Sequence, residues 1–238
     1  MILNRLACLT VLFAAIGQAI AADPVPGEYL AEGGWGTLNI KRSAEGKLHF
    51  DIESLGANGH SCSVSGIVKS GKAVPDDADP ASPCDIALKP DAGGIDVALG
   101  ESSAGCRYYC GMRASFDGRY LVPAPGCRNG ERKTVQTRFS HLYGVKDYQA
   151  ALITLQPVLT GCAPTLLWFE EAQIRNDLAV TLYHLGRKEE CLAVLKPTID
   201  AHGKTEDELR EELPPSDFES FLPLAKAAWY NRKLCGGK

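Results

Sequence analysis

The sequence predicts an α+β protein in which an antiparallel β barrel or sandwich precedes a separate α-helical domain. Between about residues 29 and 120, apolar and polar residues alternate in short runs broken by Gly, Pro, Asn and Asp, as in antiparallel strands with one buried face. From about residue 134 the apolar residues recur at helical spacing instead. This change predicts domains at residues 23–125 and 126–238, after a signal peptide at residues 1–22.

The first 22 residues have the pattern of a secretory signal peptide. One basic residue, Arg5, precedes an apolar stretch at residues 6–16, and Ala19-Ile20-Ala21 fits the small-x-small cleavage rule. A membrane-spanning helix needs about 20 apolar residues, and this stretch is shorter. We therefore expect cleavage, a periplasmic or secreted product, and no stable membrane insertion.

The β domain is expected to contain six or seven strands. Residues 37–41 and 48–53 alternate apolar and polar side chains, and the same alternation returns at residues 64–68, 86–88 and 95–99. Short strands of this number, each with one apolar face, are typical of a small barrel or sandwich around one core.

The cysteine content indicates a disulfide-bonded protein. Of nine cysteines, the one at residue 8 falls in the signal peptide, which leaves an even number in the exported chain. None of the remaining pairs has the two-residue spacing of a zinc knuckle or a redox site, so we expect structural disulfides and no metal. The eight are Cys62, Cys84, Cys106, Cys110, Cys127, Cys162, Cys191 and Cys235.

One disulfide pairing is suggested by strand phase. Cys62 is in phase with Val64, and Cys84 with Ile86, so both thiols are expected on the core face. A Cys62–Cys84 bridge would close residues 71–83, which are rich in proline and aspartate and are expected to form a surface loop.

The other pairings stay open at the level of sequence. A Cys162–Cys191 bridge is favoured because it would join adjacent helix pairs, with Cys191–Cys235 as the alternative. Cys127 could tie the two domains together or close on Cys106 or Cys110.

The second domain is expected to contain six helices and an internal repeat. A shift of 40 residues aligns Leu142-Tyr143 with Leu182-Tyr183, and Pro157 with Pro197. Helix pairs that repeat at such intervals bury their faces against neighbouring pairs. The predicted helices span residues 134–143, 147–159, 165–185, 187–199, 206–213 and 216–234.

The element Asp147-Tyr148-x-x-Ala151-Leu152 resembles the tetratricopeptide family. The resemblance implies a helical domain that binds partners on its concave surface. The period here is longer than in that family and the repeats are few, so a small domain of about two units is expected. Exposed aromatic residues at Tyr148 and Trp168 are the candidate anchors for a partner.

Composition and motifs argue against nucleic-acid binding and against catalysis. The chain has 25 Lys and Arg against 29 Asp and Glu, with a net charge of −4, so it has no basic field for nucleic acid. The five histidines are scattered, and no metalloprotease or nucleophile-elbow motif is present in the sequence. Glu170 and Glu171 could be a hydrolase carboxylate pair, but pairing of Glu171 with Arg175 on one helix is favoured. We expect no catalytic residues, no metal and no cofactor.

The segment Ser102-Ser103-Ala104-Gly105-Cys106-Arg107-Tyr108 resembles a loop of periplasmic and membrane-bound C-type lysozyme inhibitors. Ser102, Gly105, Arg107 and Tyr108 match that loop. The serine that reaches the lysozyme cleft in the family is Ala104 here, which puts that contact in doubt. The resemblance implies a contact surface on this loop, with Arg107 facing a carboxylate-lined cleft and with Tyr108 and Tyr109 as aromatic anchors.

These observations predict an exported protein that acts by binding a protein partner in the cell envelope. The leading hypothesis is an inhibitor or immunity protein against a toxin or lysozyme-like enzyme. The alternative is an envelope scaffold or assembly factor that uses a tetratricopeptide-like surface. A third hypothesis, an envelope hydrolase, has less support because the motifs are missing.

Overall fold

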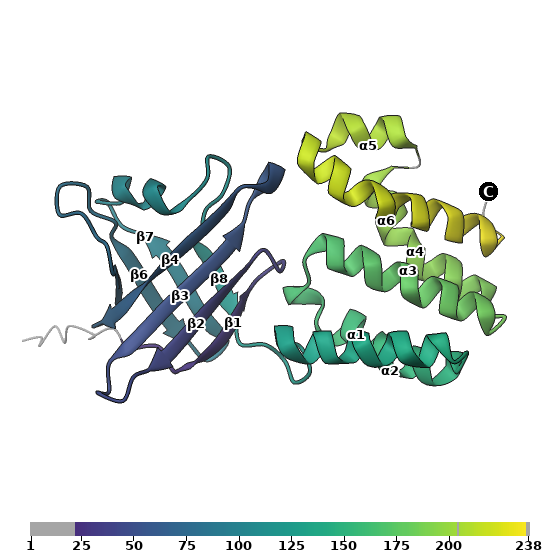
Figure 1. Ribbon diagram of the computed structural model, residues 1–238, viewed down its shortest axis with the longest axis horizontal. Coiled ribbons are helices and arrows are strands. Elements are labelled where there is room, and N and C mark those ends of the chain that lie inside the picture. The colour runs from purple at the N-terminus through teal and green to yellow at the C-terminus, as the bar shows by residue number, and fades with distance from the viewer. Residues whose placement is uncertain (1–21, 204, 237–238) are drawn as a thin grey trace, which may run out of the picture.

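The chain forms a closed β barrel followed by a layer of helices, as a computed structural model shows for residues 22–203 and 205–236. The barrel and the helices lie next to each other along the long axis of the molecule (Figure 1). The predicted signal peptide falls almost wholly outside the described residues. No helix within these two ranges is both long enough and apolar enough to cross a membrane.

Eight antiparallel strands make the barrel, one or two more than the sequence predicted. Each strand pairs with the next along the chain, and β8 closes the barrel on β1 through Leu30↔Leu121 and Ala31↔Tyr120. The strands are β1 (Gly27–Ala31), β2 (Gly36–Arg42), β3 (Leu48–Leu55), β4 (Ser61–Lys69), β5 (Lys72–Pro75), β6 (Ile86–Asp91), β7 (Gly94–Leu99) and β8 (Gly118–Leu121).

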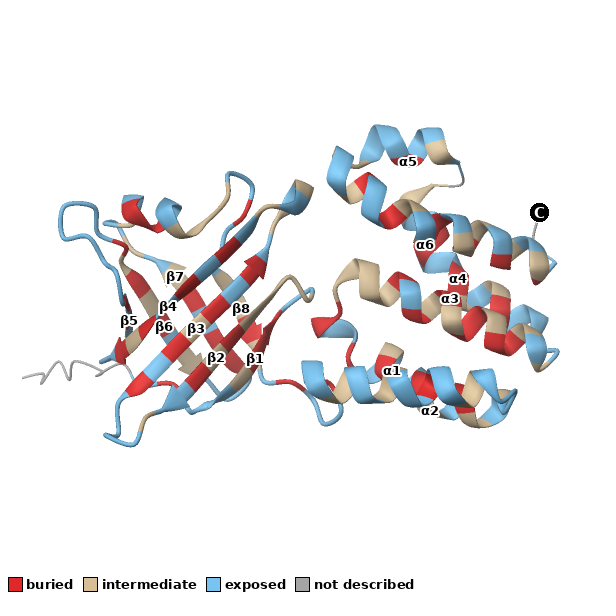
Figure 2. Ribbon diagram, in the orientation of Figure 1, coloured by how far each residue is buried: buried red, intermediate tan, exposed pale blue. Residues whose placement is uncertain are grey.

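Side chains fill the barrel interior. In the β2–β3 register Leu38 faces Ile52 and Ile40 faces Phe50, and all four are buried. Their polar neighbours point outward, so buried and exposed residues alternate along the strands (Figure 2). An eight-stranded barrel has an interior about wide enough for side chains to fill, and Tyr120 and Phe116 complete the packing here.

The strand that sequence analysis missed is β5, inside the expected loop at residues 71–83. It follows β4 through a two-residue turn in which Ser70 and Gly71 both have positive φ, 52° and 73°. Such turns match the twist of a β hairpin. A four-residue strand is too short to show an alternation of apolar and polar residues. The Ser70-Gly71 turn was the sequence feature that could have predicted β5.

The two barrel disulfides differ from the predicted Cys62–Cys84 bridge. Cys62 and Cys84 are both buried, as their phase predicted, but Cys62 bonds Cys110 and Cys84 bonds Cys106. The predicted bridge was wrong because β5 separates β4 from β6. The 3₁₀ helix η2 (Ala104–Tyr109) and Cys110 lie over this region and supply a partner to each thiol.

The two disulfides of the helical part are Cys127–Cys162 and Cys191–Cys235. The favoured Cys162–Cys191 pairing was wrong, and its alternative, Cys191–Cys235, is the one observed. Cys162 follows the end of α2 (Tyr148–Gly161), whereas Cys191 lies in the first turn of α4 (Lys188–His202). Both helices pack on α3 (Trp168–His184). Cys162 precedes the start of α3 and Cys191 follows its end, and because α3 is 17 residues, about 25 Å, long, the two cysteines are too far apart to bond. Cys127 does not tie the helices to the barrel.

Two helical hairpins repeat with the predicted 40-residue period. In both three-residue turns the middle residue has positive φ, Lys146 at 63° and Gly186 at 75°, and its N–H donates to the carbonyl of Tyr143 or Tyr183, respectively. The helices are α1 (Asn129–Gly144), α2 (Tyr148–Gly161), α3 (Trp168–His184), α4 (Lys188–His202), α5 (Glu206–Glu212) and α6 (Pro215–Leu234).

Direct hydrogen bonds join the barrel to the helices. Asn58, in the β3–β4 loop, donates its N–H to Asp217 Oδ2 at 2.9 Å and accepts from Ser216 N at 3.0 Å. The barrel thereby caps α6, whose own N-cap residue is a proline. Gly33 N donates to Pro164 O at 2.7 Å on the other side of the junction.

Replacement of Gly34 by alanine should destabilise the protein through this junction. Gly34 has φ of 75°, and a Cβ there would lie 2.1 Å from the Leu167 backbone nitrogen. Gly46 is the matched control, because its φ is 82° but a Cβ there meets nothing within 4 Å. Gly46→Ala should cost about 1–2 kcal/mol for the conformation alone. Chemical denaturation should show a larger loss for Gly34→Ala, and equal losses would contradict the tight junction.

Peptide mapping under non-reducing conditions should identify the four disulfides. Digestion between the cysteines should release peptides joined as Cys62–Cys110 and Cys84–Cys106, because only these partners meet in the closed barrel. Recovery of a Cys62–Cys84 peptide from protein folded in an oxidising compartment would refute the barrel arrangement.

Candidate functional site

The predicted loop residues lie in one segment that crosses an end of the barrel. This rim segment, residues 100–113, connects β7 towards β8 and is fastened by disulfides at Cys106 and Cys110. Backbone hydrogen bonds add to the attachment, from Gly105 N to Pro83 O at 3.1 Å and from Gly111 N to Ser61 O at 2.9 Å. The segment is therefore held at several points along a short length of chain.

Gly105 has a structural role in the rim segment. It is buried, and a Cβ there would lie 1.9 Å from the Ser82 carbonyl oxygen. Only glycine lets the chain approach the β5–β6 loop this closely. Ser102 is exposed, and its carbonyl accepts a hydrogen bond from Asp85 N at 2.9 Å.

The rim segment exposes two large apolar side chains. Tyr108 is 80% exposed and Met112 is 83% exposed. Large exposed side chains on a rigid segment are typical of a binding surface, because little conformational entropy remains to be lost. Met112 was missed from the sequence. It lies two residues after the disulfide-bonded Cys110, which could have drawn attention to it. The sequence pattern, however, does not predict that its side chain is exposed.

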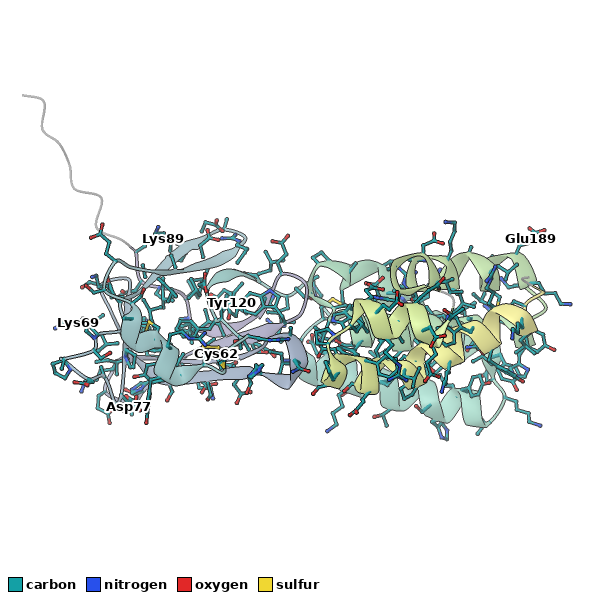
Figure 3. The ribbon with its side chains drawn as sticks, turned by 90° about the horizontal axis from the view of Figure 1, so that it is seen from above. Cys62, Lys69, Asp77, Lys89, Tyr120 and Glu189 are labelled. Carbon is teal, nitrogen blue, oxygen red and sulfur yellow. A yellow bond between two sulfur atoms is a disulfide. The ribbon has the colours of Figure 1, made fainter. Side chains whose placement is uncertain are left out.

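Tyr109 points a different way from Tyr108 and serves to anchor the segment. Its hydroxyl donates to Asp77 Oδ1 at 2.9 Å, and its ring meets that of Tyr108 edge-on at 5.3 Å. Burial, with help from the hydrogen bond to Asp77, raises the pKa of Tyr109 to about 12. Asp77 lies at the end of the molecule remote from the helices (Figure 3).

The Arg107 side chain is exposed, but part of its hydrogen-bonding capacity is used within the chain. Its guanidinium donates to the backbone carbonyls of Gly111 at 3.2 Å and Ala114 at 3.4 Å. Two of its donor atoms thus brace the chain that leaves the rim segment. To bind a partner's carboxylate as predicted, Arg107 would have to use its remaining N–H donors or give up these two hydrogen bonds.

The two predicted aromatic anchors of the helices are not brought together. Tyr148 lies at the turn between α1 and α2 and stacks on His184 with ring centroids 4.4 Å apart. Trp168 begins α3 beside the barrel and packs against Phe169 and Phe221 at 3.9 and 4.5 Å. Both rings are half-buried, so neither is a free platform.

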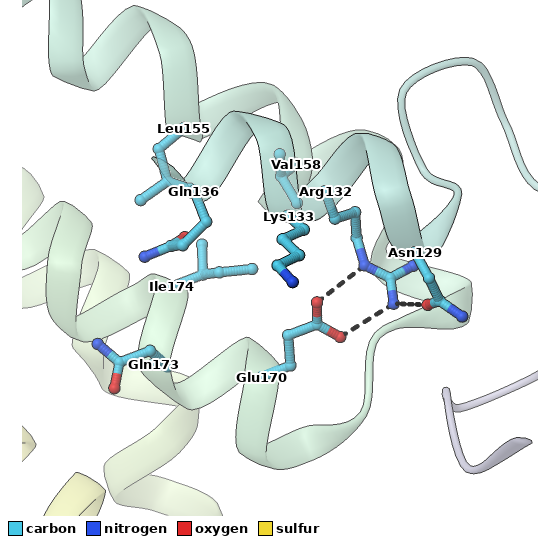
Figure 4. Close-up of a pocket in the computed structure, with 9 residues that line it drawn as sticks. All are labelled: Asn129, Arg132, Lys133, Gln136, Leu155, Val158, Glu170, Gln173 and Ile174. Atoms are coloured by element: carbon cyan, nitrogen blue, oxygen red, sulfur yellow. Dashed lines mark hydrogen bonds and ion pairs between the residues drawn. The ribbon is translucent and has the colours of Figure 1, made fainter. Parts of the chain in front are cut away.

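A groove of about 340 Å³ lies between α1 and α3, over a floor of Leu155, Val158 and Ile174. At its end Arg132 pairs with Glu170, with Nε–Oε1 at 2.8 Å and Nη2–Oε2 at 3.2 Å (Figure 4). Lys133 extends from α1 into the groove (Figure 4). It has no ion-pair partner within the described part of the chain.

Polar residues continue along the groove to Asp177. Gln136 on α1 and Gln173 on α3 each donate to one oxygen of this carboxylate at 2.9 Å. Burial raises the pKa of Asp177, and the two amide bonds partly oppose that rise. The sequence did not single out these residues, because they meet only when α1 packs on α3.

The neighbouring carboxylates of α3 are committed to different arginines. Glu171 pairs with Arg175 one turn later at 2.6 Å, which confirms the predicted local pairing. Glu170 instead reaches across to Arg132 on α1. The two carboxylates therefore do not face each other across a cleft, as a glycoside hydrolase would require.

Comparison with family models, curated proteins and solved structures finds no match for this chain.

The Tyr109 hydroxyl is expected to titrate with a pKa of about 12, against about 10 for a free tyrosine. NMR of protein labelled at tyrosine Cζ would measure it. Asp77→Asn should lower this pKa only part of the way, since burial remains as the larger cause. Asp79→Asn, in the same loop, should leave it unchanged. A Tyr109 pKa near 10 in the unaltered protein would contradict the buried contact.

Proposed function

We propose that this is an exported binding protein that inhibits a cell-envelope-directed enzyme or toxin through its rim segment. The observation that carries the proposal is one short segment, clamped by two disulfides, in which Tyr108 and Met112 are 80% and 83% exposed. A preorganised loop binds with a small ordering cost, and tyrosine is enriched at the centres of interfaces.

A lysozyme-like enzyme is the proposed partner class. The resemblance at Ser102, Gly105, Arg107 and Tyr108 supports it, and four disulfides suit an oxidising compartment such as the periplasm. Because Ala104 replaces the family's serine, the contact proposed here depends on Tyr108 and Met112 instead.

The test combines an inhibition assay with a matched surface control. Purified protein should slow the lysis of bacterial cell walls by a C-type lysozyme, and the double variant Tyr108→Ala, Met112→Ala should weaken inhibition at least tenfold. Tyr230→Ala removes a comparably exposed tyrosine from α6, 66% exposed, and should inhibit normally. Equal inhibition by all three proteins would exclude the rim segment. No inhibition by the unaltered protein would exclude this partner class.

The second candidate function is an envelope scaffold, which the α1–α3 groove favours. We propose a tetratricopeptide-like helical domain, distinct from the barrel, on the strength of the equivalent turns 40 residues apart. The groove has an apolar floor and a polar rim in which Lys133 is uncommitted, which suits a peptide segment bearing a carboxylate.

A charge reversal distinguishes the two functions. If the scaffold function holds, Lys133→Glu should abolish recovery of an envelope partner in a pull-down, while the Tyr108→Ala, Met112→Ala protein should retain it. Lys188→Glu, on the first turn of α4 and outside the groove, is the charge-matched control. If the Tyr108→Ala, Met112→Ala protein alone fails to recover the partner, the inhibitor function is favoured.

A further inference from the structure

A second pocket, of about 520 Å³, lies where the barrel meets the helices. Pockets that hold small molecules are typically about 300–1,000 Å³ and often lie at such junctions. Barrel residues Trp35 and Leu55 line one side. Trp168 and Phe169 of α3, and Asp217 and Ser220 of α6, line the other.

This pocket is formed by the contact between the barrel and the helices. The hydrogen bonds of Asn58 with the start of α6 and of Gly33 with Pro164 involve the same loops that supply the pocket walls. Its walls therefore come from separate parts of the chain, and it exists only when the barrel and the helices are docked.

Polar groups on the residues that line the pocket lack protein partners within the described part of the chain. Neither Trp35 nor Trp168 donates its indole N–H within the described residues, and neither indole nitrogen is fully buried. By contrast, the indole of Trp229 donates to Gly203 O at 3.1 Å. Asp217 uses Oδ2 for Asn58, and its Oδ1 has no hydrogen-bond partner in the described chain. The residues that line the pocket thus carry solvent-accessible donors and an uncommitted acceptor, together with aromatic rings.

This combination selects among ligand classes. A purely apolar ligand would cover the indole N–H and carboxylate groups without replacing their hydrogen bonds to water, which costs free energy. An anion would meet the carboxylate of Asp217, and a cation would meet the positive N-terminal ends of α3 and α6. A neutral ligand with an apolar face and both donors and acceptors at its edge fits best.

We propose that this junction pocket binds a neutral saccharide. A pyranose ring has an apolar C–H face that packs on an indole, and its hydroxyls both donate and accept hydrogen bonds. The indole proposed for this contact is that of Trp35, because the Trp168 ring already packs against Phe169, His202 and Phe221. In this arrangement Asp217 accepts from a sugar hydroxyl, and the indole N–H groups donate to ring or hydroxyl oxygens. The site is separate from the exposed Tyr108 and Met112, so it does not depend on the proposed inhibition.

The direct test is a titration of the full mature protein with triacetylchitotriose and maltotriose. Two of the three tryptophans line the pocket, so tryptophan fluorescence should change saturably with at least one of them. Choline and phenyl phosphate, a cation and an anion, should give no saturable change. Tighter binding of either ion than of both saccharides, or no saturable change with either saccharide, would overturn the proposal.

Variants locate the binding and separate it from folding. Asp217→Asn preserves shape and an acceptor for Asn58 but removes the charge, and it should weaken saccharide affinity about tenfold. Trp35→Phe keeps an aromatic ring, removes the indole donor, and should also weaken affinity. Glu219→Gln on the exposed side of α6 and Trp229→Phe are the matched controls and should bind normally. Calorimetry measures all four without relying on fluorescence, and unchanged affinity in both pocket variants would place the saccharide elsewhere.

Discussion

Closure of the barrel is the constraint on which the other features depend. Pairing of β8 with β1 satisfies the last strand edges and encloses one apolar interior around Phe50, Phe116 and Tyr120. It also returns the chain to the side of β1, close to where the β1–β2 turn meets the helices. The position of the helices therefore follows from the closed topology and from the few hydrogen bonds at the junction.

The covalent links reinforce an arrangement that packing already requires. η2 lies over the loop between β5 and β6. Cys106 within η2 bonds Cys84 in that loop, and Cys110, just after η2, bonds Cys62 in β4. A disulfide stabilises mainly by restricting the unfolded chain, and here it also removes freedom from an exposed segment. A rigid segment with exposed Tyr108 and Met112 is one that a partner could bind without first ordering it.

The junction gives the molecule a surface that neither the barrel nor the helices has alone. Asn58 fills a capping position that Pro214 cannot, so the first turn of α6 depends on a barrel loop. At the start of α3, the barrel residue Gly34 lies close to the Leu167 backbone, so this helix end also contacts a barrel loop. Since both helices begin at this junction, their first residues become walls of one pocket.

Much of the local structure could be predicted from the sequence by itself. Alternation predicted most of the strands, though not β5, and the inward direction of Cys62 and Cys84. Helical spacing predicted the six helices, and the 40-residue shift predicted the matching hairpins. The Glu171–Arg175 pair followed from a separation of four residues on one helix. Each of these features depends on residues close in sequence, where the backbone period alone determines which side chains share a face.

Only the tertiary structure decided which of these faces meet. Cys62 and Cys84 share a core, but an intervening strand separates them, and their partners are Cys110, just after η2, and Cys106 within it. Tyr148 and Trp168 share a helical part but lie at opposite ends of it, while Trp35 and Trp168, 133 positions apart in the chain, line one pocket. A periodic pattern specifies the direction of a side chain relative to its own element. The neighbour it finds depends on how the elements pack, and that information is spread over the whole chain.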